Sequence, residues 1–313
     1  MSEVTAVCVL LIAVVLDGVL GDPPNSLHPV AWMGRFVGWG RRRSQATQNS
    51  VRFLQGCAVV ACGAVIVATV GVLIQIACRQ FPHWLALLVQ AAVLKSTFSV
   101  RSLAGAAGSV AEALSNEDLN TARHQVAYHL VSRDVTTLDA SQLSAATIES
   151  VAENTSDSFI APLFYFVVAG LPGALLYRFV NTADAMLGYR TKELEWFGKP
   201  AAKIDDLLNL IPSRLTALVM LMIYGAYVRR TNPAIAIWWR DHSLTASPNA
   251  GHPMSAAAGV LGIVLEKQDH YRLGEGQPLP GIQSLQQSIA MLWTTAIVAV
   301  VFSVAGLLMW RTL

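Results

Sequence analysis

The sequence predicts an all-α fold, namely a polytopic integral membrane protein with broken or re-entrant helices and a polar helical cytoplasmic segment. Charged residues make up 13% of the 313 residues, about half of the roughly 25% that is usual in soluble domains. Apolar residues reach 54%. No run alternates apolar and polar residues over the length of a strand, so we expect no sheet.

Four apolar runs predict transmembrane helices, at residues 4–20, 54–78, 84–98 and 289–310. Two further apolar segments, 159–180 and 215–228, are expected to be broken or re-entrant. Pro162 and the Leu-Pro-Gly at 171–173 divide the first, and the second is short for a bilayer. Residues 101–154 are predicted to form the polar helical segment, in which Asp139 and Gln142 have the spacing of a capping box. We interpret residues 1–313 as one membrane domain.

Positive charge gives the expected orientation in the membrane. Five arginines lie between residues 35 and 52, and positive residues stay on the cytoplasmic side, so the N-terminus is predicted to lie outside. The loop at 181–213 also carries basic residues, among them Arg190. We therefore favour a re-entrant segment at 159–180, which returns that loop to the cytoplasm.

Composition and motifs exclude several classes of function. The net charge is +2 and no basic tract is present, which argues against binding to nucleic acid. The four cysteines lie in apolar runs without metal-ligand spacing, so neither a disulfide framework nor a zinc site is expected. Neither of the standard glycine-rich nucleotide loops occurs.

The candidate site begins where carboxylates meet apolar sequence. Glu149, Glu153 and Asp157 recur every four residues, so on a helix they share one face. An apolar run starts at Phe159, next to which isolated charge is costly. Such a cluster favours a bound cation, most simply Mg²⁺ carrying a phosphate. A solvated helix end is the alternative.

Three more polar groups border apolar segments. Arg178, Asn181 and Asp184 share another helical face, and Asp205, Asp206 and Asn209 form a second acidic motif before Arg214. Near the N-terminus, Asp17 lies inside an apolar run, while Asp22 and His28 follow in a turn; for Asp22 a purely turn-forming role is the alternative. His28 is the one histidine that we would test as an acid–base group or ligand.

Residues 247–259 are rich in small side chains and include Asn249 and Gly251. They lead into a predicted amphipathic helix ending at Glu266 and Lys267. Small residues would let the backbone approach a flat ligand, although close helix packing explains them equally well.

Three classes of function remain open from the residues alone. The first is a membrane enzyme that handles a phosphorylated substrate with Mg²⁺. The second is a prenyltransferase-like enzyme, since Asp205-Asp206 is similar to aspartate-rich diphosphate motifs. The third is a cation-coupled transporter, which would show two related halves that the sequence lacks.

Five ordered motifs carry a specific resemblance. They are LDGVLGDP with HPV, ENTSDSFIAPLFY, YRFVNTADAMLGY, DDLLNLIPSRLTA and SPNAGHPMSAAAGVLGI. With them the chain resembles, nearly end to end, the adenosylcobinamide-phosphate synthase family of cobalamin biosynthesis, also called CobD/CbiB. The stretches at 41–100 and 267–313 match in hydropathy alone.

The resemblance implies a C–N bond-forming ligase in a bacterial inner membrane, with its active site facing the cytoplasm. It implies ATP and Mg²⁺ as co-substrate and cofactor, and adenosylcobyric acid (the corrinoid) and (R)-1-aminopropan-2-ol phosphate as substrates. Later cobalamin-assembly membrane enzymes are candidate partners.

Roles within these motifs are hypotheses from chemistry. The predicted catalytic and metal-binding residues are Glu153, Asp157, Asp184, Asp205 and Asp206. The predicted phosphate clamps are Arg178, Arg190 and Arg214, and the residues that orient substrate or metal-bound water are Asn154, Asn181 and Asn209. The predicted corrinoid wall comprises Asp17, Asp22, His28, Asn249 and Gly251. No role is assigned to His252.

Overall fold

A computed structural model describes residues 2–44, 47–189, 191 and 193–309. Most of the described residues are helical and few form strands, which confirms the predicted all-α class. Among them, five helices are long and apolar enough to cross a membrane, or six if one bent pair counts as a span. The five are Glu3–Leu20, Asn49–Gln80, Ala140–Leu187, Leu210–Tyr227 and Ile282–Met309.

The chain divides into two compact units that each combine distant parts of the sequence. Unit 1 comprises Met1–Ser99, Ala161–Asn209 and Val300–Leu313, and unit 2 comprises Val100–Ile160 and Leu210–Ala299. Helix α14 (Ile282–Met309) contributes to both units.

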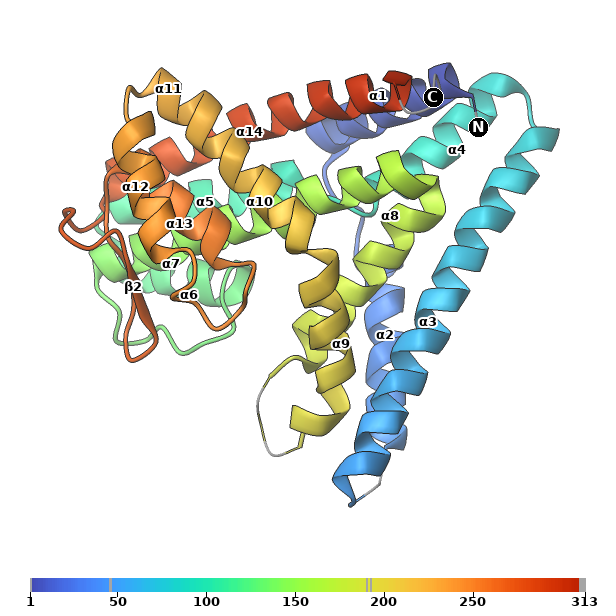
Figure 1. The fold of residues 1–313 in the computed structure, drawn as a ribbon, viewed down its shortest axis with the longest axis horizontal. Coiled ribbons are helices and arrows are strands. Elements are labelled where there is room, and N and C mark those ends of the chain that lie inside the picture. The colour runs from blue at the N-terminus through green and yellow to red at the C-terminus, as the bar shows by residue number, and fades with distance from the viewer. Residues whose placement is uncertain (1, 45–46, 190, 192, 310–313) are drawn as a thin grey trace. The chain divides into compact units, whose positions relative to one another are not determined.

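Unit 1 is built from six further helices, which Figure 1 labels. They are α1 (Glu3–Leu20), α2 (Pro29–Arg43), α3 (Asn49–Ala77, continued by the 3-10 turn η1, Cys78–Gln80), α4 (His83–Lys95), α8 (Ala161–Leu187) and α9 (Glu195–Leu208). Helix α3 packs closely on α8 and α9. Glycine makes this approach possible, because a Cβ on Gly63 would lie 2.0 Å from the Phe179 ring, and one on Gly56 would lie 2.0 Å from the Phe197 carbonyl oxygen.

Helix α8 contains the break that its Leu-Pro-Gly sequence predicts. Gly170 has φ +66° and ψ −157°, which is not helical, and Pro172 follows two residues later. Because proline has no N–H to donate, it cannot continue the helical hydrogen bonding through this point. The break is therefore confirmed, while the re-entrant path stays a prediction.

Unit 2 surrounds a small-residue helix with other helices. Its helices are α5 (Val100–Ser115), α6 (Leu119–His129), α7 (Ala140–Thr155), α10 (Leu210–Val219), α11 (Gly225–Tyr227), α12 (Thr231–Asp241) and α13 (Gly251–Leu261), with π-helical turns η2 (Ser156–Ile160) and η3 (Met220–Tyr224). Residues 251–260 of α13 are all buried. The capping box at the start of α7 is confirmed, with both of its hydrogen bonds present.

Two predictions for the segment after α13 are wrong. The helix ends at Leu261 rather than near Lys267, because Gly262 adopts the left-handed conformation that terminates helices. The expectation of no sheet is also wrong, because Glu266 and Lys267 lie in a short antiparallel hairpin of β1 (Leu265–Lys267) and β2 (Tyr271–Leu273). The N–H of Gly274 donates a 2.6 Å hydrogen bond to Asp241 Oδ2, which ties the hairpin to α12.

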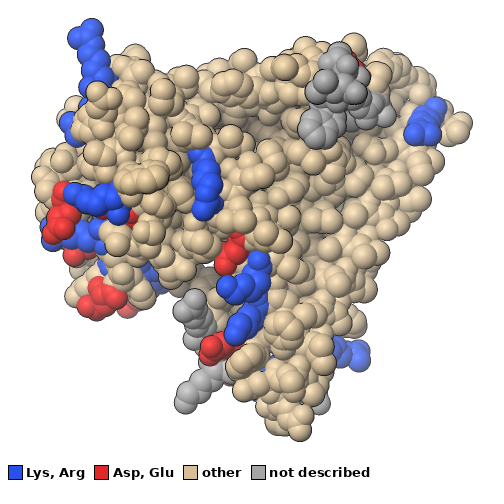
Figure 2. Space-filling view, viewed as in Figure 1, with Lys and Arg blue, Asp and Glu red and all other residues tan. Residues whose placement is uncertain are grey.

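Charged and uncharged side chains lie on different parts of the surface. In Figure 2, charged side chains gather around the hairpin, where Glu266, Asp269 and Arg272 are exposed. The surface over α3 is mostly uncharged in the same view, and its exposed side chains include Leu54 and Val65. An apolar exposed helix of this length is suited to contact with lipid.

Candidate functional site

In unit 1, the second acidic motif lies against the end of α8. Asp205 is buried, and its two oxygens accept hydrogen bonds from the amides of Asn209 (2.9 Å) and Asn181 (3.4 Å). The Tyr177 hydroxyl donates to Asn209 Oδ1 at 2.8 Å. Arg178 donates to Asn181 Oδ1 at 3.4 Å. We call these five residues the Asp205 network.

Burial raises the pKa of Asp205 to about 6, although hydrogen bonds from Asn209 and Asn181 and the charge of Arg178 act in the opposite direction. The like charge of Asp206, the next residue, contributes to the same increase. The carboxylate therefore ionises close to neutral pH, in a place where amides already fix its orientation.

The network unites four of the predicted site residues in one place, namely Arg178, Asn181, Asp205 and Asn209. Asp184 lies one helical turn beyond Asn181 near the end of α8, and Asp206 is half-buried on α9. Arg190 lies outside the described residues.

A second charged cluster in unit 1 joins the predicted N-terminal residues to a residue that sequence reasoning missed. Lys95 Nζ donates a short hydrogen bond to Asp22 and lies 3.5 Å from Asp17 Oδ1. Asp17 and Lys95 are both buried, 3% and 6% exposed. Ser99 Oγ donates to Asp22 Oδ2 at 2.7 Å. These residues, together with His28, form the Lys95 cluster.

His28 has a structural role here. Its Nδ1 accepts the N–H of Val30 and so caps α2, while its Nε2 lies 3.7 Å from Asp22 Oδ1. Asp22 is therefore more than a turn former, because it accepts hydrogen bonds from two side chains. A lone lysine in the apolar run of α4 was the signal for this cluster, since such a residue normally has a buried partner.

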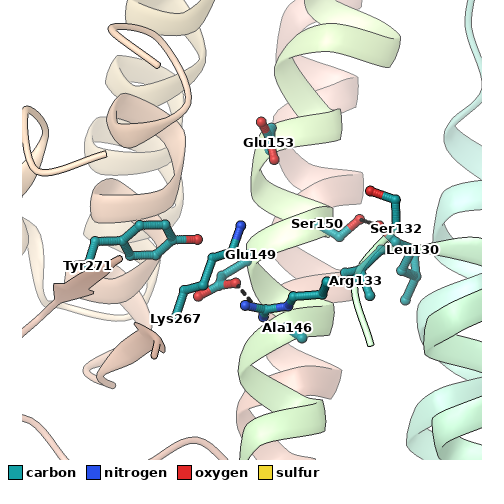
Figure 3. Close-up of a pocket in the computed structure, with 10 residues that line it drawn as sticks. Leu130, Ser132, Arg133, Ala146, Glu149, Ser150, Glu153, Lys267 and Tyr271 are labelled. Atoms are coloured by element: carbon teal, nitrogen blue, oxygen red, sulfur yellow. Dashed lines mark hydrogen bonds and ion pairs between the residues drawn. The ribbon is translucent and has the colours of Figure 1, made fainter. Parts of the chain in front are cut away.

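In unit 2, the face of α7 that carries Glu149 and Glu153 opens into a cavity of about 190 Å³. Figure 3 shows Glu149 between Arg133 and Lys267, with the Tyr271 hydroxyl pointing toward it. Arg133 lies 3.3 Å from Glu149 Oε2. Glu149 Oε1 is buried and has no hydrogen-bond partner among the described residues. We call this cavity the Glu149 pocket.

The pocket takes its side chains from three separate segments. Residues 130–133 follow α6, Glu149 and Glu153 lie on α7, and Lys267 pairs with Tyr271 across the hairpin. Burial raises the pKa of the Tyr271 phenol, and the carboxylates of Glu149 and Glu153 raise it further. The hydroxyl therefore remains a hydrogen-bond donor at neutral pH.

Other predicted residues of unit 2 lie in two further places. Arg214 donates to Asn249 Oδ1 at 3.2 Å, which brings two of them together. Gly251 is tightly packed, because a Cβ there would lie 2.1 Å from the His242 carbonyl oxygen. The small residues of α13 therefore serve close packing, and the corrinoid wall stays a prediction.

The predicted one-face arrangement of carboxylates ends at the π-helical turn η2. Asn154 lies beside Glu153 and donates to the Ser150 carbonyl, whereas Asp157 lies within η2 and does not line the Glu149 pocket. The predicted metal ligands Glu153 and Asp157 thus belong to unit 2, and the other three belong to unit 1. Within the described residues, no group of three His, Cys, Asp or Glu side chains is arranged to hold a metal.

Comparison with known proteins identifies the family. The model of the "CobD/Cbib protein" family matches residues 10–307. The chain belongs to the CobD/CbiB family. That assignment confirms the resemblance drawn from the five sequence motifs, and it places the protein in a family of cobalamin biosynthesis.

Curated CobD/CbiB relatives match over most of their length. The "Cobalamin biosynthesis protein CobD" of Dehalococcoides mccartyi is 41% identical over 85% of this chain and 86% of its own. The "Probable cobalamin biosynthesis protein CobD" of Methanothermobacter thermautotrophicus is 40% identical over 91% and 90%. The protein of that name in Methanocaldococcus jannaschii is 32% identical over 97% and 98%. No solved structure matches the chain significantly.

Proposed function

We propose that this protein is an ATP- and Mg²⁺-dependent amide ligase that joins adenosylcobyric acid to (R)-1-aminopropan-2-ol phosphate, giving adenosylcobinamide phosphate. The observation that carries the proposal is membership of the CobD/CbiB family over residues 10–307. The buried Asp205 network adds support, because it presents oxygen and guanidinium groups suited to phosphate chemistry.

The proposed reaction has two chemical steps. A propionate oxygen of the corrinoid attacks the γ-phosphorus of ATP, so that ADP leaves and an acyl phosphate remains. The amine nitrogen then attacks the acyl carbon, the C–O bond to phosphate breaks, and the amine gives up a proton to a base. The products are the amide, ADP and phosphate.

In this proposal, unit 1 would hold a magnesium ion that also binds phosphate. Mg²⁺ in such sites uses one or two carboxylates and completes its shell with water and phosphate oxygens. Asp205 and Asp206 would supply the carboxylates, and Asp184 is a further candidate. Each oxygen of Asp205 accepts one amide hydrogen bond, and a carboxylate has about four acceptor sites, so lone pairs remain for a cation. Bound Mg²⁺ would offset the negative charge of the phosphates.

The remaining groups of the network have positioning roles in this proposal. Asn209 and Asn181 hold the Asp205 carboxylate in one orientation, and the Tyr177 hydroxyl holds Asn209. Arg178 brings positive charge to the same place, where it would favour a phosphate oxygen over a neutral ligand.

The direct test uses the full chain purified in detergent, with adenosylcobyric acid, aminopropanol phosphate, ATP and Mg²⁺. We expect the amide product by mass spectrometry, with one ADP per product. Asp205→Asn should lower the rate by about 100-fold or more, the scale of losing a charge-stabilising group. Asp269→Asn is the matched control, because Asp269 is exposed and asparagine tolerates its left-handed backbone (φ 59°). ADP release that depends on neither substrate, or consumption of an isoprenyl diphosphate in place of the corrinoid, would contradict the proposal.

A further inference from the structure

We propose that the Glu149 pocket binds a small zwitterion with an ammonium and a phosphate, and that this ligand is the amino-alcohol phosphate co-substrate. The identification of the ligand rests on the proposed function. The proposal moves Glu153 from the predicted magnesium site to substrate binding.

Two positive and two acidic side chains line the pocket. Arg133 and Lys267 supply two positive groups, and Glu149 and Glu153 supply two acidic ones. Arg133 contacts Glu149. Among the described residues no carboxylate lies within 4.0 Å of the Lys267 ammonium. A ligand with one charge of each sign would complement both halves of the pocket at once.

One buried atom marks the place for the ammonium. The Glu149 side chain is 8% exposed, yet its Oε1 has no hydrogen-bond partner within the described part of the chain. A buried oxygen without a donor is costly, so the site gains most from a ligand that donates N–H bonds. Glu153, one helical turn along α7 and on the same wall of the cavity, would offset the ligand's positive charge.

The other wall is suited to the phosphate. Lys267 and Tyr271 are directly opposite each other across the hairpin, so their side chains emerge on the same face. The Tyr271 hydroxyl is a donor, and Arg133 keeps N–H groups beyond the one directed at Glu149. An ammonium, a hydroxyl and a guanidinium together form the usual donor set for a phosphate group.

Size narrows the choice of ligand. The cavity holds about 190 Å³, which is less than the roughly 300–1,000 Å³ of pockets that hold drug-sized molecules. A nucleotide or a corrinoid is therefore too large, whereas the short amino-alcohol phosphate is of suitable size. The headgroup of phosphatidylethanolamine has the same two charged groups, so an experiment has to separate the two sources.

The test is calorimetric titration of the full chain in detergent, without ATP or corrinoid. The probes are 1-aminopropan-2-ol phosphate, propan-2-yl phosphate (no amine) and 1-aminopropan-2-ol (no phosphate). We expect the complete zwitterion to bind about tenfold or more tightly than either half, since each charge-assisted contact contributes on that scale. Equal binding of propan-2-yl phosphate would overturn the proposal.

Variants locate the binding. Lys267→Met and Glu153→Gln should each weaken binding of the zwitterion about tenfold. Arg272→Met is the matched control on the same hairpin, because Arg272 is exposed and does not line the pocket. Tyr271→Phe retains the ring and should weaken binding about fivefold, so it tests the site even if a charge variant fails to fold. Unchanged affinity in all three would overturn the proposal.

Two further outcomes separate this inference from the proposed function. If the protein makes no amide but binds the zwitterion tightly, and these variants weaken that binding, the result would support the pocket as a binding site and contradict the proposed ligase activity. Amide formation with an unchanged KM for aminopropanol phosphate in Lys267→Met would support the ligase and overturn the pocket. Nanodiscs with and without phosphatidylethanolamine test the lipid source, because binding of that lipid with none of the soluble zwitterion would also overturn the proposal.

Discussion

The Asp205 network and the Glu149 pocket hold buried charge in different ways. Both oxygens of Asp205 accept amide hydrogen bonds, one from Asn181 on the neighbouring helix α8 and one from Asn209 at the end of α9 itself. Among the described residues, Glu149 has one oxygen on Arg133 and the other without a hydrogen-bond partner, beside a cavity. The first arrangement fixes a carboxylate in one orientation, and the second leaves binding capacity for a ligand. The Lys95 cluster is of the first kind, since its charges contact one another.

The largest effect is expected where the charges contact one another and are deeply buried. Lys95→Met would leave Asp17 and Asp22 without their shared cation, which should destabilise the protein by about 3–5 kcal/mol. Thermal melting in detergent measures the change. Lys203→Met is the control, because Lys203 is exposed on α9. A melting temperature equal to that of the wild type would show that the cluster does not stabilise unit 1.

A pH titration tests unit 2 away from the pocket. Burial, together with the charges of Arg214 and His242, lowers the pKa of His252 to about 4. A histidine with a lowered folded pKa binds its proton more readily when unfolded. Its stabilising effect is therefore complete above pH 6.5 and is lost as the pH falls toward 4, by up to about 3 kcal/mol. Between pH 7 and pH 4, the melting temperature should fall more steeply for the wild type than for His252→Gln. An equal fall in both proteins would contradict this.

The Arg133–Glu149 ion pair of the Glu149 pocket allows a sharper comparison. Arg133→Met should cost about 2 kcal/mol, because it leaves Glu149 as a buried charge without its cation. Adding Glu149→Gln should recover at least half of that loss, as expected for two coupled groups. Arg272→Met, which breaks an exposed pair with Glu266, should change stability by about 0.5 kcal/mol or less. Simple additivity in the double variant would show that the pair is not coupled.

The smallest effect comes from a local feature with no buried charge. Asp139→Ala removes the confirmed capping box of α7 and should cost about 1 kcal/mol. Asp118→Ala, which removes the side-chain cap of α6, should cost a similar amount. A loss of stability larger than that of Lys95→Met would mean that helix capping contributes more to stability than buried charge does.

Local spacing predicted the features that depend on one helix or one turn. The i, i+4 spacing at the end of α9 predicted that Asp205 and Asn209 lie close together. The i, i+3 spacing on α8 predicted the same for Arg178 and Asn181. The break near Pro172 and the capping box at Asp139 were predicted for the same reason. Gly262 was a signal of equal clarity for the end of α13, since glycine commonly terminates helices.

Contacts between distant segments were not predicted. Arg133, Lys267 and Tyr271 meet Glu149 only after a loop and a hairpin fold against α7, and no spacing rule brings residues 133 and 271 together. The π-helical turn η2 likewise shifts Asp157 away from the face of Glu149 and Glu153. Lys95 is intermediate. Its position in an apolar run predicts a buried partner but does not identify that partner as Asp17 or Asp22.

The most direct measurement of the proposed division of labour is a comparison of kcat and KM for aminopropanol phosphate in Asp205→Asn and Lys267→Met. We predict that Asp205→Asn lowers kcat about 100-fold with little change in KM, since it alters the groups that act in the reaction. Lys267→Met should raise KM about tenfold with little change in kcat, because it alters binding of the co-substrate. The same pattern in both variants would contradict the assignment of chemistry to the Asp205 network and co-substrate binding to the Glu149 pocket.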